Sequence, residues 1–578
     1  MPSRTARRSA GRSPFVSTRL TLAVAGAAAL GGCCGWGRLS DAPPPAPDRA
    51  PAAYAVREAG RAPARPSPTP AGPASRSARD AHWPAPWDVP QTAQPADAHA
   101  DDVSPPPAEV GFRSTAGAGA TSTFAVDVDT ASYAAVRRSL RHGSLPPAEL
   151  VRVEELLNAF ELEEPPPPEG GPPLKARVEV TGCPWAPGRR LARVTLRGRA
   201  VDPARRPAAN LVFLIDVSGS MASPERLPLV KQALALLTEQ LGERDRVAIV
   251  VYAGAAGLVL PPTCGADRRT ILDALDRLEA GGSTHGAAGI ELAYRTAAAG
   301  FVEHGVNRVV LCTDGDFNVG VRSQPDLERL IAAKARTGVF LSVLGFGVWS
   351  GDRRIEALAR RGDGHYALID DLAEARRVLV REVAGTLVTV AQDAKVQVVW
   401  DPARVAAWRL VGYENRLLRR EQFDDDRVDA GDVGAGHRVT ALYEVVPVPG
   451  ALDAVDPSAD ELCPGDRTLG LVRLRWKEPG DAESALVEVP LHDRGGAFEG
   501  ASADQRFLAA VAASGMLLRG SAHAGTATYG RALAWAERAL GRDASGQRRE
   551  WITLLRAAAR LSDSPLSAAE PWSPRRGG

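Results

Sequence analysis

Five side chains with oxygen atoms are the residues of this chain whose types and spacing best suit a chemical task. They lie in three short segments that read Asp-Val-Ser-Gly-Ser, Gly-Gly-Ser-Thr and Thr-Asp-Gly-Asp. The set offers no nitrogen or sulfur ligand, which favours a hard divalent cation such as Mg²⁺ or Ca²⁺ over Zn²⁺. Two carboxylates would neutralise one such ion, and one coordination position would stay open for a carboxylate from another molecule. The five residues are Asp216, Ser218, Ser220, Thr284 and Asp314.

The residues around the two aspartates predict the strands that must position them. Residues 210–215 read Asn-Leu-Val-Phe-Leu-Ile, an apolar run typical of a buried parallel strand, and Asp216 follows directly. Residues 308–312 form a second such run just before Asp314. Between residues 224 and 241, apolar side chains recur at helical spacing. Because open α/β sheets bind ligands beyond the carboxyl ends of their strands, both aspartates are expected at one ligand-binding edge.

This region resembles the metal-ion-dependent adhesion site of von Willebrand factor type A domains. The resemblance lies in the order of its parts: a strand, the Asp-x-Ser-x-Ser motif, a helix, a distant Thr, and a second Asp at the end of a strand. The resemblance covers residues 207–386. It implies that the five residues hold Mg²⁺, with Ca²⁺ or Mn²⁺ as alternatives, and that a protein partner presents an acidic residue to the metal. Asp316 and Asn318 would then shape selectivity beside the site. His285 is interpreted as a solvated loop residue rather than as part of the metal mouth.

Alternating strand and helix patterns over this region predict an α/β fold with a doubly wound, mostly parallel sheet. Further strands are expected near 245–253, 257–260, 339–347 and 364–369, and helices near 268–279, 286–300, 324–337, 353–360 and 371–386.

The flanking segments resemble those of a group of bacterial lipoproteins that contain type A domains. Residues 121–206 resemble the segment that precedes the domain, and residues 387–563 resemble the C-terminal domain of that group. The C-terminal domain is expected to be β-rich over 393–495 and helical over 503–519 and 528–562, before a loose tail at 564–578.

Smaller patterns within these flanks carry further predictions. Residues 174–206 alternate apolar and polar side chains, which predicts a β hairpin that joins the C-terminal β domain. Asp127, Asp129 and Thr130 predict a strand end followed by a helix cap rather than a metal loop. Three aromatic residues are expected in the core of the β-rich module: Trp408, Tyr413 and Tyr443.

The N-terminus predicts export and a lipid anchor. Residues 1–32 combine several arginines with a short apolar stretch, and Leu-Gly-Gly-Cys ends at Cys33. This pattern is typical of a lipoprotein signal, in which Cys33 is acylated and the acyl chains hold the protein on a bacterial membrane, inner or outer. An ordinary secretory signal is the alternative. Residues 33–120 are rich in Pro and Ala, which predicts a disordered tether.

Composition and absent motifs narrow the function classes. The net charge of +1 over 578 residues disfavours nucleic-acid binding. None of the five lysines follows a glycine, so the chain has no nucleotide-binding Walker A motif, and His-Glu-x-x-His and Gly-x-Ser-x-Gly are also absent. We therefore expect a non-enzymatic, metal-dependent binding protein of the cell envelope. The alternatives are a structural envelope protein whose metal only stabilises the fold, and an enzyme with an unrecognised site.

The cysteines outside the anchor show no metal-binding spacing. Cys312 lies in an expected core strand, where a buried free thiol is the simplest interpretation. An oxidising compartment permits a disulfide among Cys183, Cys264 and Cys463, and the sequence does not select a pair.

Overall fold

The computed structural model describes residues 109–562 with eleven short gaps. The predicted signal segment, Cys33 and most of the tether lie outside the described residues, as do Asp127, Thr284, His285, Asp316, Asn318, Cys463 and the tail. By contacts the chain divides into residues 1–81 and 82–578, and all described residues belong to the second unit. The gaps are 127–128, 169, 203–204, 284–285, 316–322, 348–352, 384–387, 415, 427–430, 452–466 and 482.

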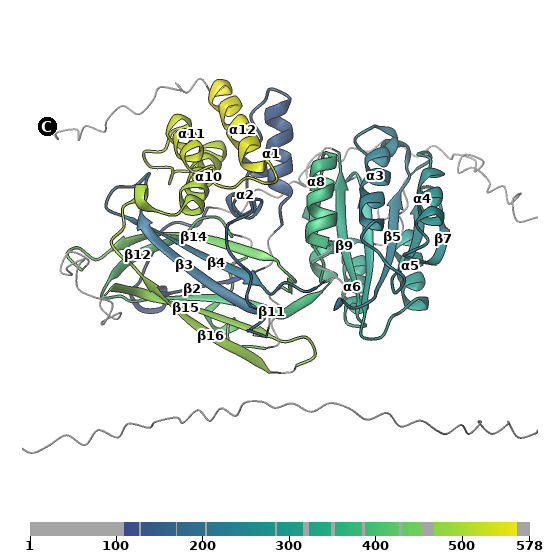
Figure 1. The fold of residues 1–578 in the computed structure, drawn as a ribbon, viewed down its shortest axis with the longest axis horizontal. Helices are drawn as coiled ribbons and strands as arrows, with labels where there is room; N and C mark the ends of the chain where they lie inside the picture. The colour runs from purple at the N-terminus through teal and green to yellow at the C-terminus, as the bar shows by residue number, and fades with distance from the viewer. Residues whose placement is uncertain are drawn as a thin grey trace, which may run out of the picture. The chain divides into compact units, whose positions relative to one another are not determined.

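A six-stranded sheet forms the centre of the predicted type A region (Figure 1). Its strand order is β10-β9-β8-β5-β6-β7, and all neighbouring pairs are parallel except the antiparallel pair β6–β7. This order and the helices between the strands confirm the doubly wound, mostly parallel fold. The strands are β5 (Ala209–Asp216), β6 (Arg246–Tyr252), β7 (Ala256–Cys264), β8 (Val306–Thr313), β9 (Val339–Phe346) and β10 (Tyr366–Ile369).

Helices cover both faces of this sheet because β5 is apolar on both sides. Leu211, Phe213 and Ile215 pack into one core with α3 (Leu227–Thr238), α4 (Arg268–Asp276) and α8 (Leu372–Arg376). Val212 and Leu214 pack into a second core with four other helices. These are α1 (Ala131–Arg141), α5 (Gly286–Ala299), α6 (Gln324–Ala335) and α7 (Arg353–Arg361). The helix predicted over 371–386 is α8 followed by a π-helical stretch, Arg377–Val383.

Two more sheets form the β-rich module and share one core. The first has the order β1-β12-β14-β4-β3; the second has the order β13-β11-β15-β16, with β2 also paired to β11. The expected aromatic residues Trp408, Tyr413 and Tyr443 are buried in this core, as is Trp400. The strands are β1 (Arg113–Ser114), β2 (Thr121–Ala125), β3 (Leu174–Gly182), β4 (Arg190–Gly198), β11 (Thr389–Trp400), β12 (Val405–Leu410), β13 (Val433–Gly434), β14 (Arg438–Pro447), β15 (Thr468–Lys477) and β16 (Ser484–His492).

Strands from before and after the type A region complete each other in these sheets. β4 pairs antiparallel with β14, and β2 pairs antiparallel with β11. The prediction that the hairpin over 174–206 joins the C-terminal β domain is therefore confirmed. The type A region is inserted between two chain segments that build one β module.

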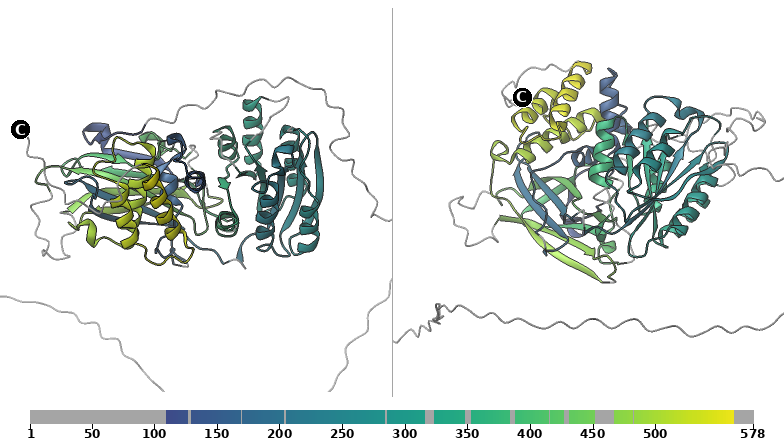
Figure 2. Two further views of the ribbon diagram at one scale, coloured as in Figure 1. Left: turned by 90° about the horizontal axis from the view of Figure 1, so that it is seen from above. Right: turned by 45° about the vertical axis from the view of Figure 1, so that its right-hand side comes forward.

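A helical layer accompanies the β module and has its own core, which includes Phe160, Phe507 and Trp551. Figure 2 shows these helices beside the β strands. The helix predicted over 528–562 is two helices, because Gly541 and Gly546 adopt positive φ angles of 56° and 76° and interrupt it. The helices are α1 (Ala131–Arg141), α2 (Val153–Asn158), α10 (Ala503–Arg519), α11 (Tyr529–Arg538) and α12 (Gln547–Leu561).

Thr130 occupies the N-cap position of α1, as the prediction of a helix cap required, but neither Asp129 nor Thr130 caps the helix with its side chain. The Thr130 hydroxyl accepts a hydrogen bond from Arg377 at 2.9 Å, and Asp129 forms an ion pair with Arg416 at 2.6 Å. These polar groups are committed to residues far away in the chain, which a local pattern does not reveal.

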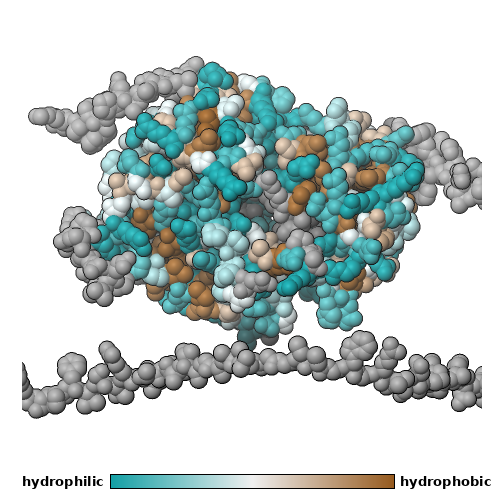
Figure 3. Space-filling view, viewed as in Figure 1, coloured by the Kyte–Doolittle hydropathy of each residue, from teal (hydrophilic) through white to brown (hydrophobic). Residues whose placement is uncertain are grey.

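The cysteines, the helix lengths and the surface complete the description of the fold. Cys312 is buried as expected, and Cys183 and Cys264 are free thiols. Within the described ranges, no helix has the length and apolar character needed to cross a bilayer. The face in Figure 3 carries small groups of hydrophobic residues separated by hydrophilic ones.

Candidate metal centre at the ends of two parallel strands

Two neighbouring strands bring the two aspartates to one edge of the sheet. β5 and β8 are parallel, with Ile215 opposite Cys312, so Asp216 and Asp314 both follow the carboxyl ends of paired strands. Asp216 is fully buried, and Asp314 is 7% exposed. The Thr313 hydroxyl faces Asp216 Oδ2 at 3.5 Å. The expected juxtaposition of the two aspartates is therefore present.

The Asp-Val-Ser-Gly-Ser turn places its two hydroxyls together. The Ser218 amide donates to Asp216 Oδ1 at 2.9 Å, which folds the turn back over the aspartate. The Ser218 and Ser220 hydroxyl oxygens lie 3.1 Å apart. Ser218 is buried, whereas Ser220 is exposed, so this cluster of oxygens extends from the interior to the surface.

The loop that leads to Thr284 is fastened to the same turn. The Gly281 amide donates to the Val217 carbonyl at 2.7 Å, and the Gly219 amide donates to the Gly282 carbonyl at 3.1 Å. Gly282 has a φ of 85°, a conformation that side chains disfavour. These bonds place the loop beside the serines as far as Ser283, while Thr284 itself lies outside the described residues.

Burial changes the acid–base properties of this edge. It raises the pKa of Asp216 to about 6, and the charge of Asp314 adds to the increase, although hydrogen bonds from Ser218 oppose it. Burial and the charge of Asp216 also raise the pKa of Tyr252, so its hydroxyl keeps its proton. A cation beside Asp216 and Asp314 would offset the cost of holding two carboxylates in a poorly solvated place.

Arg226 is a neighbour of the site that the sequence analysis missed. Its Nη1 donates to Asp314 Oδ2 at 2.7 Å and to the Ser220 carbonyl at 2.6 Å. Gly347 allows this approach, because a Cβ at that position would lie 3.0 Å from Arg226 Nε. Arg226 comes six residues after Ser220 and matches no spacing rule, so only the folded chain shows its role.

The donor set fits a hard divalent cation. The described part of the site offers two carboxylates and two hydroxyls and no sulfur or nitrogen ligand, as Mg²⁺ or Ca²⁺ requires. The Arg226 guanidinium already pairs with Asp314, so a metal ion would share this carboxylate with it. No group of three or more His, Cys, Asp or Glu side chains among the described residues is arranged to hold a metal ion; the described part of this site has two carboxylates, and its other oxygen donors are hydroxyls.

Comparison with known proteins shows the family of each part of the chain. Residues 211–316 match the von Willebrand factor type A domain, residues 108–193 match a von Willebrand factor family, and residues 385–561 match the C-terminal family of the uncharacterized protein YfbK. YfbK of Escherichia coli K12 is 42% identical over 455 residues, which span 76% of this chain and 78% of that protein.

Two solved structures are also similar. The von Willebrand factor type A protein from Catenulispora acidiphila is 18% identical and aligns over 69% of this chain and 91% of its own, with a TM-score of 0.38. BatB from Bacteroides thetaiotaomicron is 21% identical over 30% of this chain and 97% of its own, with a TM-score of 0.26.

Proposed function

Because the chain belongs to the family of the Escherichia coli protein YfbK and contains a von Willebrand factor type A domain, we propose that it binds a protein partner through a divalent cation. The cation is held by Asp216, Ser218, Ser220, Thr284 and Asp314, with Mg²⁺ as the first candidate and Ca²⁺ or Mn²⁺ as alternatives. The observation that supports this proposal is the meeting of Asp216, the two serine hydroxyls and Asp314 at one edge of the sheet.

The exposure of Ser220 favours binding over a purely structural metal. A metal that only stabilised the fold would be enclosed by protein ligands. Here the innermost ligand, Asp216, is buried, but Ser220 lies at the surface. An acidic side chain of a partner would complete the coordination from that side, and the charge-assisted contact would be strong because part of the site excludes water.

We further propose that acylated Cys33 holds the protein on a bacterial membrane and that residues 33–120 act as a tether. This part of the proposal rests on the sequence pattern alone. No enzymatic role is proposed, since the hydroxyls beside Asp216 serve the cation in this scheme and the sequence lacks the nucleophile and zinc-protease motifs named above.

Metal titration tests the first step. Isothermal titration of the full chain with Mg²⁺ and Mn²⁺ should show one site that is lost in Asp216→Ala and Asp314→Ala. Asp273→Ala is the matched control, because this aspartate is 59% exposed on α4 and is not one of the proposed ligands. If neither ion binds the wild-type chain, the proposal fails.

Partner binding is tested separately with isolated cell envelopes. Proteins retained by the wild-type chain with Mg²⁺ should be released by EDTA and should not be retained by Ser220→Ala at equal loading. Normal metal binding without any Mg²⁺-dependent partner would instead support the structural alternative.

A further inference from the structure

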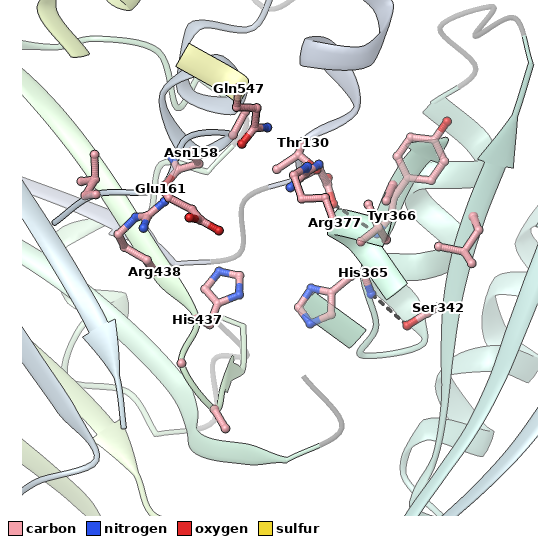
Figure 4. Close-up of a pocket in the computed structure, with 18 of the residues that line it drawn as sticks. Thr130, Asn158, Glu161, Ser342, His365, Tyr366, Arg377, His437, Arg438 and Gln547 are labelled. Carbon is pink, nitrogen blue, oxygen red and sulfur yellow. Dashed lines mark hydrogen bonds between the residues drawn. The ribbon is translucent and has the colours of Figure 1, made fainter. Parts of the chain in front are cut away.

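A second hollow lies away from the candidate metal centre. It has a volume of about 540 Å³ and is lined from several elements, among them β4, β14, β9, β10 and the first residue of α12. Figure 4 shows that Arg438, Gln547, His437, His365 and Arg377 surround its open space. Cavities of a few hundred Å³ with a few converging polar groups are typical of small-molecule sites.

Two arginines of this hollow lie directly opposite each other on neighbouring strands. Arg438 of β14 pairs in register with Arg197 of β4, and Arg197 pairs in register with Lys175 of β3. Directly opposed residues of an antiparallel sheet point to the same face, and like charges in this position destabilise the pairing. The three residues form a basic row whose two arginines line the hollow.

The carboxylates near this row are committed to other arginines. Glu164 pairs with Arg193 at 3.2 Å, and Asp504 pairs with Arg548 at 2.5 Å. Asp129, which also lines the hollow, pairs with Arg416.

Glu161 lines the hollow beside Arg438, and its negative charge favours the protonated form of both arginines. Yet within the described residues neither Arg197 nor Arg438 forms an ion pair.

The arginines keep unused hydrogen-bonding capacity. The buried Nε of Arg197 has no hydrogen-bond partner among the described residues, and Arg438 donates to the carbonyl of Phe160. Burial lowers the pKa of both arginines, that of Arg438 to about 10, and the charge of Arg197 contributes to the effect on Arg438. Both arginines are half-buried, and the charges of Glu161 and Glu164 offset only part of the desolvation cost, which a bound anion would reduce further.

Gln547 supplies a second, independent indication of a ligand. Its side chain is 8% exposed and lines the hollow, and neither amide atom has a hydrogen-bond partner in the described structure. Figure 4 shows the amide directed toward the open space. A buried amide with both donor and acceptor unused has capacity for a polar ligand group.

We propose that this hollow binds a small organic anion whose carboxylate or phosphate group contacts Arg197 and Arg438. A guanidinium group can donate two parallel hydrogen bonds to two oxygens of a carboxylate or phosphate group. The Gln547 amide then contacts a polar atom elsewhere on the ligand. Leu162, Leu344 and Val378 line the remainder and accept its apolar part.

Titration of the full chain with inorganic phosphate and, separately, with citrate tests this site. Isothermal calorimetry at constant ionic strength, adjusted with sodium chloride, measures the dissociation constants, and the two probes distinguish a phosphate ligand from a carboxylate ligand. We expect saturable binding of at least one probe. Arg438→Gln and Arg197→Gln should each raise its dissociation constant by at least about tenfold, the usual effect of losing one charge-assisted hydrogen bond.

Two further variants keep the test decisive. Arg177→Gln is the matched control, because Arg177 is a 56% exposed arginine of β3 that pairs with Glu164; it should bind like wild type. Arg438→Lys keeps the charge and should retain weaker binding even if Arg438→Gln unfolds. The proposal is overturned if neither probe binds wild type, if Arg438→Gln binds equally well, or if Arg177→Gln reduces binding as much as Arg438→Gln, which would indicate an adventitious ion only.

Discussion

Arg226 forms an ion pair with Asp314 at 2.7 Å and simultaneously donates to the Ser220 carbonyl at 2.6 Å. The guanidinium therefore contacts one proposed metal ligand and the backbone of another. It is only 24% exposed, so the pair is partly shielded from solvent. A divalent cation at this site must share Asp314 with a positive charge that the chain itself supplies.

This competition predicts that removing the charge of Arg226 strengthens metal binding. In Arg226→Gln, the Mg²⁺ dissociation constant should fall about tenfold, the equivalent of one partly buried charge-assisted contact. Isothermal titration of wild type, Arg226→Gln and the control Arg269→Gln measures the effect; Arg269 is 93% exposed on α4. An unchanged or larger dissociation constant in Arg226→Gln would show that the arginine does not compete with the ion.

Because the pKa of Asp216 is raised, we expect the free energy of unfolding of the metal-free chain to depend on pH. Its pKa of about 6 in the fold exceeds the usual value of about 3.9, so folding favours the protonated form. The protonated Asp216 side chain therefore contributes to the stability of the fold. This contribution is complete below about pH 4 and is lost as the pH rises through about 6.

With EDTA present, Asp216→Asn should therefore become more stable than wild type by about 2 kcal/mol as the pH rises from 4 to 8. In Mg²⁺ the order should reverse, because asparagine does not neutralise the ion. Urea unfolding at intervals of one pH unit measures both, with Asp273→Asn as the exposed control. A difference that does not vary with pH would contradict the assigned burial cost.

Arg137 of α1 joins three chain segments through ion pairs, and we expect it to contribute strongly to the stability of the fold. It contacts Glu374 at 3.2 Å and Glu550 at 3.4 Å, and it also pairs with Asp370. Arg137 is 2% exposed, and Arg137→Met removes the ion pair of the buried Asp370, whereas Glu374 keeps Arg377 and Glu550 keeps Arg141. We expect a loss of about 3–5 kcal/mol in urea unfolding.

Arg141 on the same helix is the control for this substitution. It is 49% exposed and pairs with Asp371 and Glu550, so Arg141→Met should cost less than about 1 kcal/mol. Equal effects of the two substitutions would mean that burial does not set the strength of these contacts.

The inserted position of the type A region predicts which fragments can fold. Residues 387–562 lack β2 and β4, which pair with β11 and β14 in the chain. Expressed alone, they should show broad amide resonances and no cooperative unfolding, because β11 and β14 are then unpaired along one edge. Co-expression with residues 109–206 should restore a cooperative transition. A cooperative transition of 387–562 alone would contradict this dependence.

The local parts of the fold follow from the sequence because their causes lie within a few residues. A continuous apolar run makes β5 a buried strand, and the Asp-Val-Ser-Gly-Ser turn after it places Asp216 at the carboxyl end. The alternation of strands and helices then implies that Asp314 meets it, as found. Helix ends were predicted less well, since the helix expected over 528–562 is interrupted at Gly541 and Gly546.

Contacts between distant segments were decided only by the tertiary structure. Arg226 reaches Asp314 across 88 positions of sequence, and nothing near Arg226 signals this contact. Arg197 meets Arg438 because two strands on either side of the inserted domain pair in one register, and a shift of one residue would turn one of them to the opposite face. The sequence by itself thus determined the elements and the order of the proposed metal ligands, whereas strand pairing and register decided which charges face each other, because these depend on packing across the whole chain.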